Sequence, residues 1–299
     1  MKVIVTGASG FVGRYLCDHL RAHGDEVIAL DRSHDPAIDV VDRDSVFKAF
    51  SAAGAEAVYH LAAATHVGRS WQAPIETLRI NVEGTLNVLD AAREAGLSRA
   101  LVVGSAEEYG RSANGLDAVP EDAPLRPTTP YGASKVAASF VALQAQLGTG
   151  FPVIRTRSFN HTGPGQSEMF VVPALARRIA DAERRGYDEI AVGRTDTIRE
   201  VNDVRDIVEA YRLLLLEGEA GAVYNVCSGV GLAIGDIAAR LVALARRPLR
   251  VREDAELVRP VDVPRLVGDP ARLQAATGWA PQHAVDDTLA DVLEHARRA

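Results

Sequence analysis

This sequence has few cysteines, no excess of positive charge and no long apolar run, and each shortage excludes a class of protein. Its two cysteines, Cys17 and Cys227, lie far apart, which excludes a disulfide framework and favours a reducing compartment such as the cytoplasm. The net charge of -7 predicts no broad basic surface, so we expect neither nucleic acid nor a membrane as a partner. Runs such as Leu213 to Leu216 are too short to cross a bilayer, and MKVIVTGASG lacks the apolar stretch of a signal peptide.

A metal site is not expected either. His19 and His23 have the i, i+4 spacing of one helix face, but nothing else nearby in the sequence completes a set of ligands. Histidines near the C-terminal end of a helix are favoured there by the partial negative charge of the helix dipole. We therefore predict that this pair only stabilises the C-terminal end of the helix.

The 299 residues, of which 47% are hydrophobic, are enough for one large domain or for a nucleotide-binding domain with a smaller lobe. The first motif is TGASGFVG at residues 6–13, between the apolar run Val3 to Val5 and a helical pattern. Gly7, Gly10 and Gly13 allow a sharp turn, close approach of a pyrophosphate to backbone N–H groups, and close packing of helix on strand. The motif predicts a dinucleotide site because it stands between a strand and a helix.

Short β-like runs alternate with helical patterns through the first half of the chain. We predict strands at Lys2–Thr6, Glu26–Leu30, Asp39–Val41, Ala57–Leu61, Ala100–Val103 and Phe151–Arg157, and helices at Phe11–His23, Ser45–Ala53, Ile75–Ala95 and Tyr131–Leu147. This order is typical of an α/β fold, a doubly wound parallel sheet of Rossmann type with helices on both faces.

The alternation becomes irregular after Asn160. We predict a loop at His161–Gly165 and a helix at Val172–Arg185. Residues 1–160 are then the NAD(P)-binding domain, and residues 161–299 form mainly a smaller substrate-binding lobe. Segments at about 203–227 are expected to return to the first domain.

Asp31 ends the second predicted strand, where a carboxylate can accept hydrogen bonds from both ribose hydroxyls of adenosine and repel a 2′-phosphate. The next residue, Arg32, can instead accept that phosphate. NAD(H) is favoured on this ground, and NADP(H) remains open. An ordinary acid at a strand end is the simpler alternative.

Tyr131 and Lys135 stand four residues apart on a predicted helix that Pro130 begins, so both side chains lie on one face. The neighbouring ammonium is expected to lower the pKa of the phenol, which then exchanges a proton at a carbonyl group. Ser105 follows a predicted strand and can hydrogen-bond both the substrate oxygen and the tyrosine. Each residue alone has an ordinary surface or turn explanation; the catalytic interpretation rests on their combination with the glycine motif.

Together these segments resemble the extended short-chain dehydrogenase/reductase family of nucleotide-sugar enzymes. The resemblance spans nearly the whole chain, in HLAAATHVGRSW, NVEGTLNVLDAA, GSAEEYG, PTTPYGASK, RSFNHTGPGQ, REVNDVRD and RPVDVPRLVGD. Within that family, FNHTGPGQ followed by FVVPALARRIA is most similar to GDP-4-keto-6-deoxymannose reductases and GDP-mannose 4,6-dehydratases.

The resemblance implies a set of contacts. Besides the three glycines, Asp31, Arg32, Tyr131 and Lys135, the expected cofactor contacts are Phe11, Val12, Asp39, Val40, Leu61, Ala62 and Ala63. The expected contacts to a GDP-sugar are Glu107 to the hexose, Asn160, Arg199 and Arg259 to the phosphates, and Asp262 to the ribose. Glu200 and Val201 depart from the acid and aromatic residues usual in the family after the first arginine.

One position bears on the reaction. Dehydratases of this family follow the catalytic serine or threonine with a proton donor and a glutamate, and here these positions hold Ala106 and Glu107. Because alanine cannot donate a proton to a leaving hydroxyl, the resemblance favours reduction of the C4 keto group of a GDP-4-keto-6-deoxyhexose, giving GDP-rhamnose or its talose epimer. The alternatives are a GDP-mannose 4,6-dehydratase that uses another proton donor, a 4-epimerase of another nucleotide sugar, and a non-catalytic dinucleotide-sensing scaffold. Relatives pair through two long helices, so a homodimer with a four-helix interface is expected at Ile75–Ala95 and Tyr131–Leu147.

Overall fold

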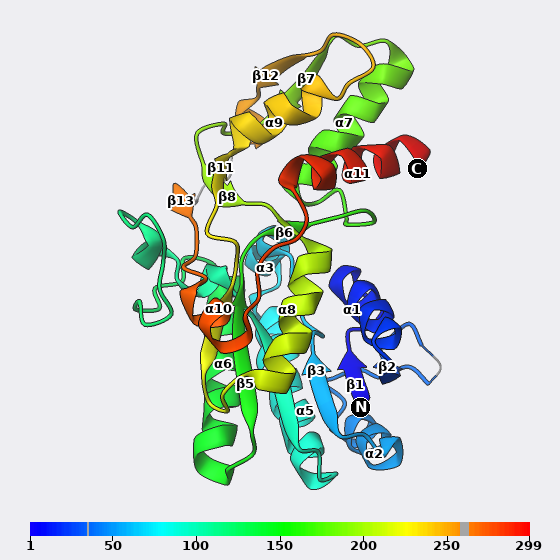
Figure 1. Cartoon of the computed structure of the whole chain (residues 1–299), viewed down its shortest axis with the longest axis vertical. Coiled ribbons are helices and arrows are strands. Elements are labelled where there is room, and N and C mark those ends of the chain that lie inside the picture. Colours follow the sequence, from blue (N-terminus) through cyan, green and yellow to red (C-terminus); the bar gives the residue numbers. More distant parts are fainter. Residues whose placement is uncertain (35, 258–262) are drawn as a thin grey trace.

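A parallel sheet of six strands forms the centre of the computed structural model, which describes residues 1–34, 36–257 and 263–299 (Figure 1). The strand order is β10-β5-β4-β3-β1-β2, and every neighbouring pair is parallel. The strands are β1 (Lys2–Thr6), β2 (Glu26–Leu30), β3 (Ala57–His60), β4 (Arg99–Ser105), β5 (Val153–Ser158) and β10 (Val223–Val226). This confirms the predicted Rossmann-type fold.

Helices cover both faces of this sheet, because alternate residues of each buried strand point to opposite sides. Val3 and Val5 of β1 belong to one apolar cluster, and Ile4 between them belongs to another. The first face carries α1 (Phe11–Ala22), α8 (Val204–Glu217) and α10 (Ala271–Thr277), and the second carries α2 (Arg43–Ala53), α5 (Gly84–Glu94) and α6 (Pro130–Thr149). Thr129 caps α6 by accepting a hydrogen bond from the amide of Gly132, and Pro130 is its first residue.

The turn between β1 and α1 depends on two of its glycines. Gly7 has φ of +70°, in the left-handed region, and a Cβ there would lie 2.7 Å from the backbone nitrogen of Ala62. A Cβ at Gly13 would lie 2.1 Å from the carbonyl oxygen of Gly7. Larger residues would therefore push the helix away from the strand.

Two of the sequence-based element predictions are wrong in detail. Asp39–Val41 is a loop: the Asp39 side chain accepts a hydrogen bond from the amide of Val41, and Asp42 then caps α2. A three-residue run without a neighbour to pair with has no reason to extend. The predicted loop at His161–Gly165 begins instead with the short strand β6 (His161–Thr162), which pairs with β9 (Asn202–Asp203).

The long helix predicted at Ile75–Ala95 is present in three parts. It consists of α4 (Pro74–Leu78), a π-helical turn η1 (Arg79–Glu83) and α5. Such a turn shifts the register of the side chains that follow it. Asn81, in this turn, donates to Ser134 of α6 and to the carbonyl of Ala64, which explains why the irregularity is kept in a buried position.

The second half of the chain builds a smaller unit above the sheet (Figure 1). Its apolar core lies among α7 (Val171–Arg185), α9 (Ile234–Ala243) and α11 (Val285–Arg298). Small sheets flank it: β7 (Glu189–Val192) pairs with β12 (Arg250–Glu253), and β8 (Ile198–Glu200) pairs with β11 (Gly231–Ala233) and β13 (Arg265–Leu266). The short helix α3 (Val67–Gln72) and the 3-10 turns η2 (Ala106–Glu108), η3 (Arg111–Ala113) and η4 (Ala255–Leu257) complete the elements.

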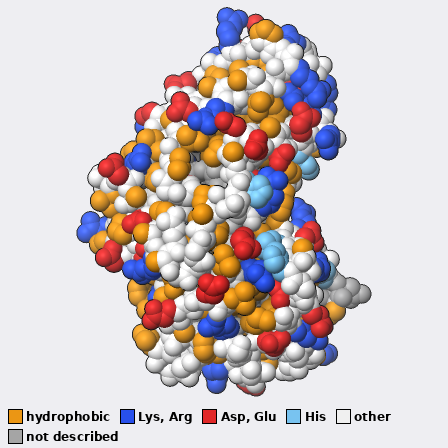
Figure 2. Space-filling model, in the orientation of Figure 1, with side chains coloured by type: hydrophobic (Ala, Val, Ile, Leu, Met, Phe, Trp, Pro, Cys, Tyr) orange, Lys and Arg blue, Asp and Glu red, His pale blue; other side chains and the backbone are white. Residues whose placement is uncertain are grey.

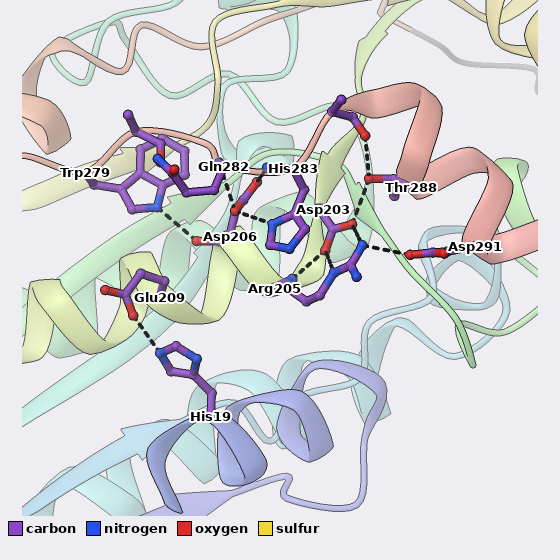
Figure 3. A network of polar contacts seen from close by, with 12 residues as sticks. His19, Asp203, Arg205, Asp206, Glu209, Trp279, Gln282, His283, Thr288 and Asp291 are labelled. Atoms are coloured by element: carbon purple, nitrogen blue, oxygen red, sulfur yellow. Dashed lines mark hydrogen bonds and ion pairs between the residues drawn. The ribbon is translucent and has the colours of Figure 1, made fainter. Parts of the chain in front are cut away.

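A polar network joins α8 to the C-terminal segment (Figure 3). Asp206 of α8 accepts hydrogen bonds from the amides of Gln282 and His283, and its carbonyl accepts one from the indole of Trp279. Asp203 accepts a hydrogen bond from the hydroxyl of Thr288 in α11. These hydrogen bonds connect α8, which packs on the large sheet, to the smaller unit.

The surface carries charge of both signs. Acidic and basic side chains are interspersed over the face drawn in Figure 2. Among the described residues, no helix is both long enough and apolar enough to span a bilayer.

The glycine turn yields a stability prediction. Gly13→Ala is expected to lower the free energy of unfolding by about 1–3 kcal/mol, because the new methyl group meets backbone atoms that cannot move aside. Gly148→Ala is the matched control, because Gly148 is an exposed residue of α6. The new methyl group there meets only the flexible amide of Gln144. That change should be neutral or stabilising by up to about 1 kcal/mol. Denaturant unfolding of both variants checks this, and equal losses would refute the packing argument.

Candidate active site

A cavity of about 850 Å³ lies beyond the carboxyl ends of the strands, between the large sheet and the smaller unit. The predicted site residues within the described part of the chain all line it, whereas Arg259 and Asp262 lie outside the described residues. Those that line it are Gly7, Gly10, Phe11, Val12, Gly13, Asp31, Arg32, Asp39, Val40, Leu61, Ala62, Ala63, Ser105, Glu107, Tyr131, Lys135, Asn160 and Arg199. The fold therefore gathers residues from most of the chain into one space.

The N-terminus of α1 opens into this cavity and fits a pyrophosphate. Gly10 is the N-cap, no side chain caps the helix, and no acidic residue stands in the first turn. The first backbone N–H groups of a helix are unpaired within it and favour negative charge. The glycine cradle and these amides are the features that a dinucleotide requires.

Asp31 stands at the end of β2, at the other side of the glycine turn. Its carboxylate accepts hydrogen bonds from the amide of Ser9 at 3.3 Å and from the amide and hydroxyl of Ser33 at 3.1 and 3.0 Å. Partial burial opposes ionisation, but the hydrogen bonds from Ser33 and Ser9 outweigh it and lower the pKa of Asp31. The carboxylate is thus ionised and held in place.

Tyr131 and Ser105 both line the wall of the cavity. Both residues are buried, at 8% and 9% exposed. Burial raises the pKa of Tyr131, and the nearby hydroxyl of Ser105 only partly opposes this. The predicted lowering of the tyrosine pKa by Lys135 is wrong in this structure, because removal from water has the larger effect. The phenol is held in its protonated form.

Lys135 is buried one helical turn further along α6. Its ammonium donates a hydrogen bond to the carbonyl of Val103 at 2.8 Å. Burial lowers the pKa of Lys135 to about 8, although the negative charge of Glu108 raises it. The amine is therefore poised to change charge close to neutral pH.

Glu108 is a site residue that the sequence reasoning missed. It is fully buried beneath Ser105, where one carboxylate oxygen accepts from the amide of Ser105 at 2.9 Å and the other from Nε of Arg157 at 3.1 Å. Arg157 also donates to the hydroxyl of Tyr109. The S-x-x-E spacing of Ser105 and Glu108 was the available signal, because it is the pattern of a capping box, and the structure has that box at η2.

On the side of the smaller unit, three guanidinium groups line the cavity: Arg199 was predicted, and Arg178 and Arg194 were not. Arg178 lies on α7, within the segment FVVPALARRIA, and donates to the carbonyl of Ala191. Arg194 forms an ion pair with Asp196. This concentration of positive charge suits an anionic ligand such as a diphosphate.

The two departures after Arg199 have structural explanations. Glu200 is buried and accepts hydrogen bonds from the amides of Gly268 and Ser228 at 2.7 and 2.8 Å, so it ties three segments together. Val201 belongs to the apolar core of the smaller unit.

Comparison with known proteins identifies the family. The family described as GDP-mannose 4,6 dehydratase matches residues 4–292. The chain belongs to this family. It is thus a member of the extended short-chain dehydrogenases/reductases, as the sequence motifs predicted.

The chain is similar to several known proteins over nearly its full length. A GDP-6-deoxy-D-mannose reductase of Pseudomonas aeruginosa is 36% identical over 294 residues, covering 98% of this chain and 96% of the relative. The structure of RMD from P. aeruginosa complexed with NADPH matches with a TM-score of 0.91 at 36% identity and covers 99% of both chains. A UDP-glucose 4-epimerase from Thermus thermophilus, in complex with NAD, matches with a TM-score of 0.89 at 28% identity over the whole of both chains.

The buried lysine yields a pH-dependent prediction. The pKa of Lys135 is lower in the folded than in the unfolded chain, so holding it charged costs stability below about pH 8, and the cost disappears as the pH rises towards 10.5. Lys135→Met should therefore raise the free energy of unfolding at pH 7 by about 1–2 kcal/mol, after allowance for the unpaired Val103 carbonyl.

Unfolding of the wild type and Lys135→Met at pH 7 and pH 10 measures this difference. The gain should shrink at pH 10, and the exposed control Lys48→Met should show neither effect. A Lys135→Met variant less stable than the wild type at pH 7 would show that the lysine stabilises the fold.

Proposed function

We propose that this protein is an NAD(P)H-dependent reductase of the C4 keto group of a GDP-4-keto-6-deoxyhexose, with a GDP-6-deoxyhexose of the GDP-rhamnose type as product. The observation that carries the proposal is that Tyr131, Ser105 and Lys135 line the same cavity as the glycine turn. The identity of 36% to a GDP-6-deoxy-D-mannose reductase supports the choice of substrate.

Each residue has a role that follows from its surroundings. Ser105 donates a hydrogen bond to the keto oxygen and polarises it. Tyr131, protonated because it is buried, gives its proton to the alkoxide that develops at C4. Lys135 stabilises the phenolate that remains, since it lies on the same face of α6.

The cofactor site fits a dinucleotide with its pyrophosphate at the N-terminus of α1 and its adenosine ribose at Asp31. When bound, a reduced nicotinamide supplies the hydride. Arg32 also lines the cavity beside Asp31, so NADPH and NADH both belong in the assay. Phe11, Val12, Asp39, Val40, Leu61, Ala62 and Ala63 are proposed to complete this half of the cavity.

The substrate half uses residues of the smaller unit. Arg199, with Arg178 and Arg194, would bind the diphosphate of a GDP-sugar together with Asn160, and Glu107 would contact the hexose; all five residues line the cavity. We assign residues 161–299 mainly to this substrate-binding lobe and residues 1–160 to the nucleotide domain, to which residues 203–227 return. Arg259 and Asp262 stay predictions as further contacts to the nucleotide.

Ala106 favours a reductase over a dehydratase, which eliminates water. It follows Ser105 directly, is buried, and offers no proton to a leaving hydroxyl. The family also contains dehydratases, and Glu107 is retained, so GDP-mannose is the substrate that tests this alternative.

The deciding assay combines the purified protein with GDP-4-keto-6-deoxymannose and either NADPH or NADH. We expect absorbance of the reduced nicotinamide to fall as product forms, and Tyr131→Phe to lower kcat by about 100-fold or more because the proton donor is lost. Tyr187→Phe, an exposed tyrosine that does not line the cavity, is the matched control and should keep full activity. No loss of absorbance with either cofactor would reject the reductase, and turnover of GDP-mannose without net change in cofactor would identify a dehydratase.

We further propose a cytoplasmic homodimer. Its two cysteines are both buried as free thiols, which agrees with a reducing compartment. Helices α4, α5 and α6 carry a group of exposed apolar side chains, and an aqueous monomer gains nothing by exposing them. These residues are Ile75, Leu78, Leu86, Phe140 and Leu147.

Sedimentation tests the dimer. The double variant Ile75→Glu with Phe140→Glu should sediment as a monomer, because unpaired carboxylates would be buried at the interface. Val230→Glu changes an equally exposed residue between β10 and β11 and should leave the dimer intact. A wild type that sediments as a monomer at all concentrations would reject this part of the proposal.

A further inference from the structure

Two histidines and a glutamate meet where α1 packs against α8. His19 lies in the last turn of α1, His23 is its C-cap, and Glu209 lies on α8. Their candidate ligand atoms all lie within 4.8 Å of one another. The third candidate ligand lies 190 residues from His19 in the sequence, so residues nearby in the sequence did not indicate it.

The hydrogen bond of His23 leaves one of its ring nitrogens available. Nδ1 of His23 faces the carbonyl oxygen of His19 at 2.9 Å and donates to it, so that Nε2 keeps its lone pair. Donation of the second ring nitrogen to a backbone carbonyl is the usual arrangement of metal-binding histidines. Nε2 of His19 lies 2.6 Å from a carboxylate oxygen of Glu209, and the rings of the two histidines are 4.4 Å apart between centroids (Figure 3 shows His19 and Glu209). Small rotations of the three side chains would separate His19 from Glu209 and let all three bind one ion.

We propose that His19, His23 and Glu209 form a site for a divalent transition-metal ion such as Zn²⁺ or Ni²⁺, with water in the remaining positions. Two imidazoles and one carboxylate are typical ligands for these ions and poor ligands for Mg²⁺. The site is separate from the cavity of the proposed reductase, since none of the three residues lines that cavity.

The local charges favour a cation. The C-terminal end of α1 presents the negative end of the helix dipole. Arg212 opposes a cation here; its Nε lies 3.7 Å from the carboxylate of Asp25, which also pairs with the N-terminal ammonium.

An ion at this place would join two elements of the nucleotide-binding region. Helix α1 begins in the glycine turn, and α8 is fastened by Asp203 and Asp206 to the C-terminal segment. An ion that binds only the folded chain stabilises it by mass action. The site should therefore act as a clamp whose effect appears as thermal stability.

The experiment uses the full chain without a histidine tag, freed of metal by chelation. Calorimetric titration with ZnCl₂ and NiCl₂ should show one ion bound per chain and a saturable rise in melting temperature, whereas MgCl₂ should have no effect. His23→Gln should weaken Zn²⁺ binding by about tenfold or more while leaving the metal-free melting temperature nearly unchanged, because this side chain is exposed. Glu209→Gln should also weaken binding.

His295→Gln is the matched control, since it removes another exposed helical histidine at a place where no such group of ligands forms in the described chain. It should bind Zn²⁺ like the wild type. Equal Zn²⁺ affinity of His23→Gln and the wild type, or no saturable binding by the wild type, would overturn the proposal. Neither result depends on the reductase activity, because no substrate is present.

Discussion

The removal of ionisable groups from water at the edge of the large sheet is the constraint on which the site depends. Burial keeps Tyr131 protonated and brings the pKa of Lys135 to about 8. Both effects would vanish in an open cleft, where solvent restores ordinary pKa values. Burying these ionisable groups costs free energy, and the apolar clusters on both faces of the sheet offset that cost.

The buried pair Glu108 and Arg157 belongs to the same constraint. A buried ion pair contributes little net stability, but it fixes geometry, since each partner must keep its hydrogen bonds. Here one oxygen of Glu108 holds the amide of Ser105, so the end of β4 is rigid where the serine hydroxyl meets Tyr131. The negative charge of Glu108 also keeps the Lys135 pKa from falling further. A structural pair thereby tunes and positions the reacting groups.

The smaller unit and the sheet share this cavity because the chain crosses between them repeatedly. β10 returns to the sheet edge beside β5, α8 packs against α1, and the network around Asp203 and Asp206 fastens the C-terminal segment. Arg178, Arg194 and Arg199 therefore line the same cavity as the glycine turn. A GDP-sugar and a dinucleotide placed in this cavity would each contact a different half of the molecule.

The sequence alone was enough for the local features: the glycine turn, the strand and helix alternation, and the start of α6 at Pro130. It also indicated many of the residues that line the cavity, but not Arg178 or Arg194. These follow from periodicity, backbone restrictions and motif spacing, which act over a few residues or came with the family resemblance. The strand predicted at Asp39–Val41 was wrong, because a strand forms only where a neighbouring strand can pair with it. Three outcomes depend on the folded chain: burial keeps Tyr131 protonated, Glu108 faces inward, and Glu209 lies beside His19 and His23. These outcomes depend on which distant segments exclude water or come together, and neither is encoded in the spacing of neighbouring residues.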